Sequence, residues 1–289
     1  MARKHQRTIG RTSGAVGLSL LVACAMAFGQ DNAPAPQTPL MPAPFSRDCQ
    51  LGGNEITADS QLPHVAAALQ QRKQIKILAI GASFAVRRRH MRGGHTDEIR
   101  DILQQAIKGL DVVMINRGVS GELSAQAAPR IKNEVALTEP DLVLWQVGTN
   151  DALAYVPLDD LEETIVDTVR WLKEHKVDVV LVGLQYVDLM EQDQNYRAVR
   201  DLLRKIATQE NVMIVRRYEA QRLLQQAEKS GGGLIPDEFE RSEAGYVCLA
   251  QYMARAITLG IFGQSLRVRP ITGQPGRPPS PPAVAPTDD

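Results

Sequence analysis

Five short apolar runs, separated by segments with helical periodicity, most restrict the fold of this 289-residue sequence. The runs are IKILAIG (75–81), DVVMINRG (111–118), DLVLWQVG (141–148), VDVVLVGLQY (177–186) and NVMIVRRY (211–218). Their apolar residues are consecutive instead of alternating, which is typical of strands covered on both faces. Strands that alternate with helices predict an α/β protein, a three-layer α/β/α sandwich around a mostly parallel five-stranded sheet.

The two ends of the chain differ in composition from the region that holds the apolar runs. Residues 1–29 begin with basic side chains, continue with an uncharged apolar run and end with small residues, which predicts a signal peptide. Residues 30–47 and 265–289 are rich in proline and poor in large apolar residues, which predicts a linker and a disordered tail. The folded domain is therefore expected over residues 48–264, a length that can bury one full-sized core.

The signal peptide implies export, to the bacterial periplasm or out of the cell. Small residues at Ala25 and Ala27 fit cleavage after Ala27, whereas LVAC ending at Cys24 leaves open the alternative of a lipoprotein anchored at that cysteine. With the signal removed, Cys49 and Cys248 remain, and an oxidising compartment favours a disulfide between them over two buried thiols. No later stretch approaches a membrane-spanning length, so we expect no transmembrane span after the signal.

Charge and motifs exclude several other classes of function. The chain has 33 basic and 33 acidic residues, a balance that does not indicate a nucleic-acid partner. GVSG (118–121) is too short for a dinucleotide fingerprint, the sequence has no Gly-Lys-Ser/Thr phosphate loop, and no cluster of histidine or cysteine has the spacing of metal ligands. We therefore expect neither a cofactor nor a metal.

Three residues that could take part in catalysis follow three of the predicted strands. Ser83 ends GAS (81–83), Gly121 ends NRGVSG (116–121), and Asn150 lies in GTND (148–151). Because parallel strands place their carboxyl ends at one edge of the sheet, where such sheets bind ligands, we expect these residues to lie close together. Acyl transfer needs a nucleophilic hydroxyl and hydrogen-bond donors for the developing oxyanion, which a backbone N–H and an asparagine amide can supply.

These three segments, together with DEFERSEAGY (237–246), resemble the four sequence blocks of the SGNH, or GDSL-like, serine hydrolases. The resemblance extends from residue 75 to about residue 260 and implies an α/β/α fold of the SGNH or flavodoxin-like type. It implies hydrolysis of esters, often acetyl or acyl groups on carbohydrates or lipids. On the matching positions it implies that Ser83 is the nucleophile, that Gly121 and Asn150 are oxyanion donors, and that Asp237 orients the base.

The sequence departs from the family pattern at two positions. Ala82 replaces the aspartate of Gly-Asp-Ser, which we interpret as a mild change. Glu240 replaces the histidine of the block Asp-x-x-His, which takes the proton of the serine. A carboxylate with a pKa of about 4 is a far poorer base than imidazole, and Asp237 would repel it instead of orienting it. The pattern therefore predicts an atypical or impaired base.

The segment AVRRRHMRGGHTDE (85–98) offers two substitutes for the missing base, His90 and His95, on the predicted loop after Ser83. Its arginines also permit an anionic ligand at the mouth of the cleft. We therefore predict an exported serine ester hydrolase of the SGNH type that acts on a small acyl ester or an acylated glycan. The alternative is a non-catalytic module of the same fold that binds an acylated or anionic glycan. The pattern identifies neither the substrate nor the oligomeric state.

Overall fold

The computed structural model of the protein describes residues 49, 60–85, 94–231 and 243–266. The predicted signal peptide and linker lie outside the described residues, as does the predicted tail beyond Leu266. Asp237, Glu240, His90 and the side chain of Ser83 also lie outside them. The last helix ends at Leu266, two residues beyond the expected end of the domain.

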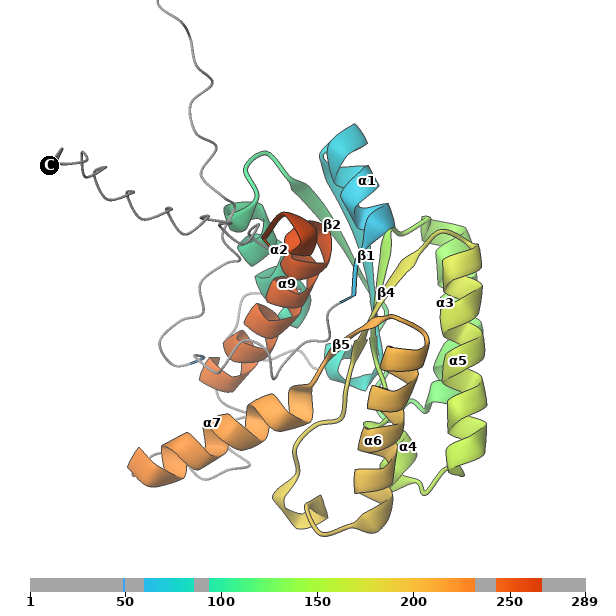
Figure 1. Ribbon diagram of the computed structural model, residues 1–289, viewed down its shortest axis with the longest axis vertical. Helices are drawn as coiled ribbons and strands as arrows, with labels where there is room; N and C mark the ends of the chain where they lie inside the picture. The colour runs from blue at the N-terminus through green and yellow to red at the C-terminus, as the bar shows by residue number, and fades with distance from the viewer. Residues whose placement is uncertain (1–48, 50–59, 86–93, 232–242, 267–289) are drawn as a thin grey trace, which may run out of the picture. The chain divides into compact units, whose positions relative to one another are not determined.

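A parallel sheet of five strands forms the centre of the domain (Figure 1). Its strands are spatially ordered β2-β1-β3-β4-β5, and all four pairings are parallel. The sheet confirms the predicted fold class, and each apolar run supplies one strand. The strands are β1 (Gln74–Ile80), β2 (Asp111–Asn116), β3 (Leu142–Gln146), β4 (Asp178–Val182) and β5 (Met213–Val215).

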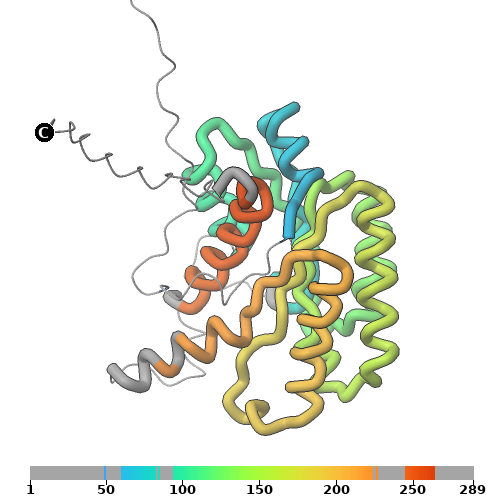
Figure 2. Tube along the Cα trace, viewed as in Figure 1, coloured from blue at the N-terminus to red at the C-terminus, as the bar shows by residue number. Residues whose placement is uncertain are grey.

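Two layers of helices cover the two faces of the sheet, which explains why the strand sequences are continuously apolar. Successive residues of a strand point to opposite faces. Ile75, Ile77 and Ala79 of β1 therefore pack in one core cluster, and Leu78 and Ile80 pack in the other. Figures 1 and 2 show the two helical layers. The first contains α1 (Pro63–Arg72), α2 (His95–Ala106) and α9 (Glu243–Leu266), and the second α3 (Ser124–Thr138), α5 (Leu158–Glu174) and α6 (Gln194–Gln209).

The order in which successive strands are added to the sheet reverses at β1. The chain passes from β1 to its neighbour β2 on one side, and then returns to β3 on the other side of β1. Such a reversal opens a crevice at the carboxyl ends of the strands, where α/β proteins bind ligands. Three short elements begin at this edge, namely η2 (Ala82–Ala85) after β1, α4 (Thr149–Leu153) after β3 and η3 (Asp188–Met190) after β4. The longer helix α7 (Arg217–Gly231) begins there after β5.

A disulfide joins Cys49 to Cys248 in α9, as predicted from the pair of cysteines. Both residues are buried, and their Cα atoms are 5.2 Å apart although 199 positions separate them in sequence. The hydroxyl of Tyr252 donates to the backbone oxygen of Cys49 at 3.2 Å. The disulfide and this hydrogen bond hold Cys49 against the last helix. None of the helices in the described part of the chain has the length and apolar composition needed to cross a bilayer.

Candidate functional site at the carboxyl edge of the sheet

The segments that hold Ser83, Gly121 and Asn150 meet at the carboxyl edge of the sheet. A narrow pocket there, too tight to enclose a water molecule, is lined by Gly81 at the end of β1, by Glu122 beside Gly121, and by Asn150. The first and third sequence blocks therefore line this pocket together with Glu122, the residue that follows the second block. Ser83 lies in η2, two residues after Gly81.

Hydrogen bonds tie the segment of Ser83 to the segment after β2. The side-chain nitrogen of Asn116 donates to the backbone oxygen of Phe84 at 3.0 Å. Its side-chain oxygen accepts a hydrogen bond from the backbone nitrogen of Gly118 at 3.0 Å. One asparagine thus fixes both the turn after β1 and the start of the loop that leads to Gly121.

Asn150 is oriented toward the loop of Gly121. Its side-chain nitrogen donates to the backbone oxygen of Glu122 at 2.9 Å. An amide nitrogen carries two hydrogens, so this bond orients the group while a second N–H remains to serve as a donor. Gly121 has a φ of +76°, and an added Cβ would meet no atom within 4 Å. Backbone conformation therefore favours glycine at this position, which opens to free space instead of a crowded wall.

Asp151 links the third block to the start of α3. The residue is only 2% exposed. Its Oδ1 accepts from the backbone nitrogen of Ser124 at 2.8 Å and from the Ser124 hydroxyl at 2.7 Å, and its Oδ2 accepts from the backbone nitrogen of Gly148 at 3.2 Å. This carboxylate therefore sets the distance between the loop of Gly121 and the segment of Asn150. Asp151 is not among the site residues predicted from the sequence, although its place in GTND is a usable signal.

A buried carboxylate lies beside the predicted oxyanion donors. The side chain of Glu122 is only 3% exposed and pairs with the guanidinium of Arg130 on α3. Arg130 also donates to the backbone oxygen of Arg117 at 2.8 Å, and Arg117 pairs with Glu134 at 2.9 Å. These contacts anchor the loop between β2 and α3 to the body of the helix.

Gly81 and Gly148 allow the strand ends to approach each other closely. Gly81 has a φ of +118°, and an added Cβ would lie 2.3 Å from the backbone oxygen of Gln146 at the end of β3. Gly148 has a φ of +96°, and its Cβ would lie 2.9 Å from side-chain atoms of Leu184 and Leu203. At Gly81 the contact is with backbone that cannot move away, so this position requires glycine, whereas at Gly148 the positive φ and the packed leucines together favour glycine.

The prediction that His95 lies on a loop is wrong. His95 is the first residue of α2. Its ring is buried and stacks on the ring of Tyr246 in α9, with centroids 3.5 Å apart and planes 15° apart. The apolar faces of α2 and α9 pack together here, which explains why the helix begins earlier than the polar sequence suggested. Within the described ranges, no group of three histidine, cysteine or acidic side chains is placed to hold a metal ion.

The fold and this arrangement of blocks at the carboxyl edge define an α/β/α protein of the SGNH hydrolase class. Residues 48–262 match the Non-GDSL lipase-like family, and the chain belongs to that family. An acetylxylan esterase from Geobacillus stearothermophilus is 25% identical over 179 residues, which cover 57% of this chain and 80% of the relative.

Solved structures of that organism's acetylxylan esterase Axe2 share the fold. A catalytic mutant is 24% identical with a TM-score of 0.51, and Axe2 itself is 23% identical with a TM-score of 0.50. Each comparison covers 63% of this chain and 94% of the other. The match to the family and to this fold confirms the predicted SGNH-like resemblance.

Proposed function

We propose that this chain is a serine ester hydrolase that uses Ser83 as its nucleophile on an acyl or acetyl ester of a small molecule or glycan. The observation that carries the proposal is the pocket where Gly81, Glu122 and Asn150 meet, because it joins the first and third blocks of a serine hydrolase to the residue that follows the second block. Membership of a lipase-like family supports the same reaction class. The acetylxylan esterase relative makes an acetylated glycan a reasonable substrate class.

The chemistry follows from the donors beside Ser83. Attack of its hydroxyl oxygen on the ester carbonyl forms a tetrahedral intermediate whose oxygen becomes negative. The backbone N–H of Gly121 and the amide of Asn150 stabilise that oxygen, and loss of one such donor typically costs about 3–4 kcal/mol of transition-state stabilisation. Asp151 and Glu122 act as positioning residues, since they hold the two donor segments together.

The base is the part of the machinery in which this chain differs from its relatives. Catalytic mutants of Axe2 include substitutions of a serine, an aspartate and a histidine three residues after the aspartate. Here the fourth block has Asp237 and, three residues later, Glu240. We propose that Glu240 makes the base atypical or impaired, and that activity is correspondingly low.

Glu240→His tests this proposal directly. A positioned general base typically contributes about 10²–10⁴-fold, so the substitution should raise hydrolysis of a small activated ester by a factor in this range. The gain should vanish when Ser83→Ala is added, because members of a triad act as a unit. Rapid turnover by the unmodified protein would instead assign the base to another group, such as His90 or His95.

The replacement at Glu240 also favours a second candidate function, a non-catalytic module that holds an acylated or anionic glycan in the same pocket. A fluorophosphonate probe separates the two, because it labels only an activated serine. Labelling at Ser83 that Ser83→Ala abolishes supports the hydrolase. An unlabelled protein that still binds an acetylated oligosaccharide supports the binding module.

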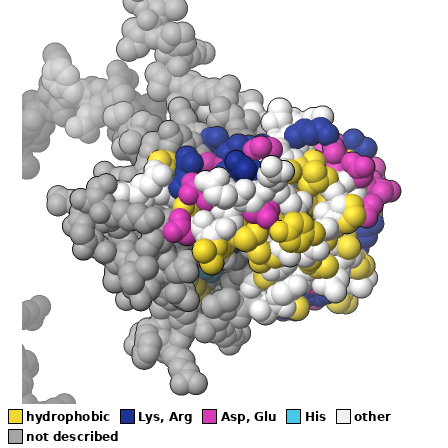
Figure 3. All heavy atoms as spheres, turned by 90° about the horizontal axis from the view of Figure 1, so that it is seen from below, with side chains coloured by type: hydrophobic (Ala, Val, Ile, Leu, Met, Phe, Trp, Pro, Cys, Tyr) yellow, Lys and Arg dark blue, Asp and Glu magenta, His cyan; other side chains and the backbone are white. Residues whose placement is uncertain are grey.

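The carboxyl edge presents apolar side chains that suit an acyl group or the face of a sugar. Hydrophobic side chains gather on this face of the molecule (Figure 3). The large exposed hydrophobic side chains in the described segments after β2, β3 and β4 include Val119, Leu153, Tyr155 and Leu189. Burial of such surface by a ligand contributes about 25 cal/mol per Å². These apolar side chains therefore favour a ligand that places an uncharged acyl or sugar group next to the oxyanion donors.

We also propose that the protein is exported to the periplasm or secreted. The signal-like residues 1–29 and the buried disulfide between Cys49 and Cys248 support this location, because disulfides persist in oxidising compartments. A lipoprotein anchored at Cys24 is the alternative. Cell fractionation with and without Cys24→Ala distinguishes them, since only a lipoprotein would leave the membrane fraction when Cys24 is replaced.

A further inference from the structure

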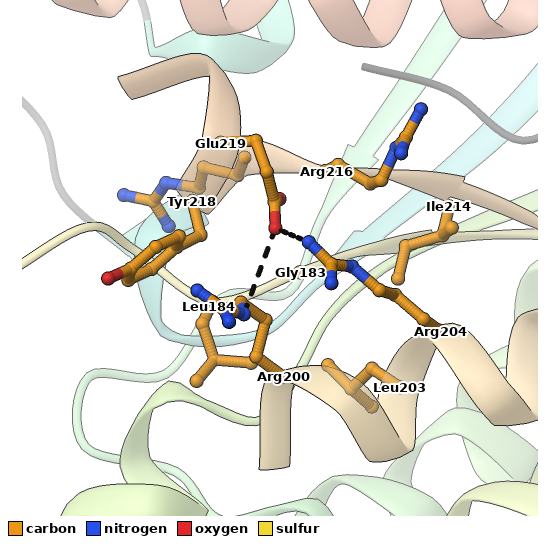
Figure 4. Close-up of a pocket in the computed structure, with 10 residues that line it drawn as sticks. Gly183, Leu184, Arg200, Leu203, Arg204, Ile214, Arg216, Tyr218 and Glu219 are labelled. Atoms are coloured by element: carbon orange, nitrogen blue, oxygen red, sulfur yellow. Dashed lines mark hydrogen bonds and ion pairs between the residues drawn. The ribbon is translucent and has the colours of Figure 1, made fainter. Parts of the chain in front are cut away.

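A small hollow at the carboxyl ends of β4 and β5 is lined by four arginines (Figure 4). Arg200 and Arg204 come from α6, Arg216 follows β5, and Arg217 begins α7. The enclosed space measures only about 10 Å³, and the hollow opens to solvent. It is separate from the pocket of Asn150, because the residues that follow β4, the middle of α6 and the start of α7 contribute its walls.

One carboxylate of this chain already lies among the guanidinium groups. Glu219 accepts a hydrogen bond from Arg204, and its Oε1 is 3.8 Å from Nε of Arg200. Figure 4 shows Arg200 and Arg204 reaching toward Glu219, whereas the guanidinium of Arg216 points away from it. Burial first, and then repulsion by Arg200, lowers the pKa of Arg204; Arg216 adds to the repulsion, and Asp201 opposes it. Positive charge is thus concentrated in a partly desolvated space.

The positive groups are held in place before any ligand arrives. The guanidinium carbon of Arg200 lies 4.7 Å from the centroid of the Tyr218 ring, a cation–π contact. Arg204 is also fixed by Asp201 at 3.2 Å. Arg217 is buried, and it forms with Tyr218 and Glu219 the first turn of the 15-residue helix α7, which lines the hollow. The start of a helix adds a further preference for negative charge.

We propose that this hollow binds an oxyanion, namely a carboxylate, sulfate or phosphate group carried by a ligand, with Arg200 and Arg204 as its contacts and Arg216 as a further positive charge nearby. The planar fork of a guanidinium matches two oxygens of such a group, which makes arginine suited to these anions. Glu219 occupies the position of an internal anion, and an incoming oxyanion competes with it for Arg204.

The hollow lies on the same edge of the sheet as Asn150, which follows β3. Neighbouring strands are about 5 Å apart, so one to two strand spacings, about 5–10 Å, separate the end of β3 from the hollow. An ester ligand that extends from Asn150 across the edge would place a negative group there. This selection of an anionic ester rests on the proposed function, whereas binding of the oxyanion does not.

Calorimetric titration of the full chain with inorganic phosphate, sulfate and glucuronate tests the site, with chloride at matched ionic strength as reference. We expect saturable binding of at least one of these anions, and the three arms distinguish phosphate, sulfate and sugar carboxylate. The double variant Arg200→Gln/Arg204→Gln should lower the affinity at least tenfold. The control Arg170→Gln, which removes an exposed arginine paired with Glu210, should leave the affinity unchanged.

Two further variants keep the proposal falsifiable if the double variant fails to fold. Arg216→Gln should lower the affinity at least threefold. Glu219→Gln should raise it severalfold, because it removes the internal competitor. Absence of saturable binding in both the unmodified chain and Glu219→Gln would overturn the proposal. It would also be overturned if the arginine variants bound the anions as tightly as the unmodified chain does. Anion binding without ester hydrolysis would leave this site standing and refute only the hydrolase.

Discussion

Asp151→Asn tests whether one buried carboxylate holds the two donor segments of the site together. Asp151 accepts three hydrogen bonds, two from Ser124 and one from the backbone of Gly148. An asparagine can still accept with one oxygen, but its NH₂ group must then face the N–H of Gly148. Two bonds lose their charged acceptor, and one buried donor loses its partner.

The size of the effect follows from these three bonds. A hydrogen bond to a charged group contributes about 1 kcal/mol more than a neutral one, and an unsatisfied buried donor costs about 1–3 kcal/mol. We therefore expect Asp151→Asn to lower the free energy of unfolding by about 3–5 kcal/mol. Urea unfolding at pH 7, with the midpoint and the slope both fitted, measures this change.

The matched control is Asp159→Asn, an exposed aspartate in the first turn of α5. It loses only its interaction with the helix dipole, so its effect should stay below about 1 kcal/mol. A change of less than 1 kcal/mol for Asp151→Asn would refute the reasoning. Loss of fluorophosphonate labelling with unchanged stability would also contradict it, because a positioning residue must act through the structure.

Three further substitutions test the fold around the site. Replacing Cys49 and Cys248 by alanine should lower the free energy of unfolding by up to about 5 kcal/mol, the loop-closure value for 199 residues; reduction of the unmodified chain should have the same effect, and an unchanged urea midpoint would contradict this. Gly81→Ala should lower the free energy of unfolding by more than about 4 kcal/mol or prevent folding, because its Cβ would overlap the backbone of β3. Gly109→Ala, where φ is +78° and the space is open, should lower it by only about 1–2 kcal/mol. Similar urea midpoints for the two variants would refute the clash. Burial at the start of β4 raises the pKa of Asp178 from an unfolded value near 4 to about 6, so the folded state binds this proton more tightly. The free energy of unfolding should then fall by about 2–3 kcal/mol as the pH rises from 4 to 7, and Asp178→Asn should lack this fall; parallel pH profiles of the two proteins would exclude it.

Much of the fold could be read from local sequence patterns. Consecutive apolar residues marked all five strands because both faces of a parallel sheet are covered, and each residue of such a strand is buried whichever way it points. The last run was read as eight residues, but only Met213–Val215 form β5, since the arginines that follow open a helix. The disulfide could be predicted because only one pairing was available once the signal is removed.

The site could be predicted in part, where the chemistry resides in the sequence blocks themselves. Asn150 and Glu122, the residue after Gly121, line one pocket and are joined by a hydrogen bond, a proximity that the order of the blocks indicated. The assignments of Ser83, Asp237 and Glu240 remain predictions about roles. His95 shows the limit of this approach, because its burial depends on a contact with Tyr246, 151 positions later, which no local pattern encodes.

The sequence by itself determined the five strands and the class of fold, because hydrophobic periodicity and motif spacing are local properties of the chain. Only the tertiary structure decided that β1 lies between β2 and β3, that Gly81 must be glycine, and that Asp151 is a clamp. It also gathered arginines of α6 and α7 around one hollow. These features depend on burial and on hydrogen bonds between segments far apart in sequence, whose free energies exist only once the chain has brought the segments together.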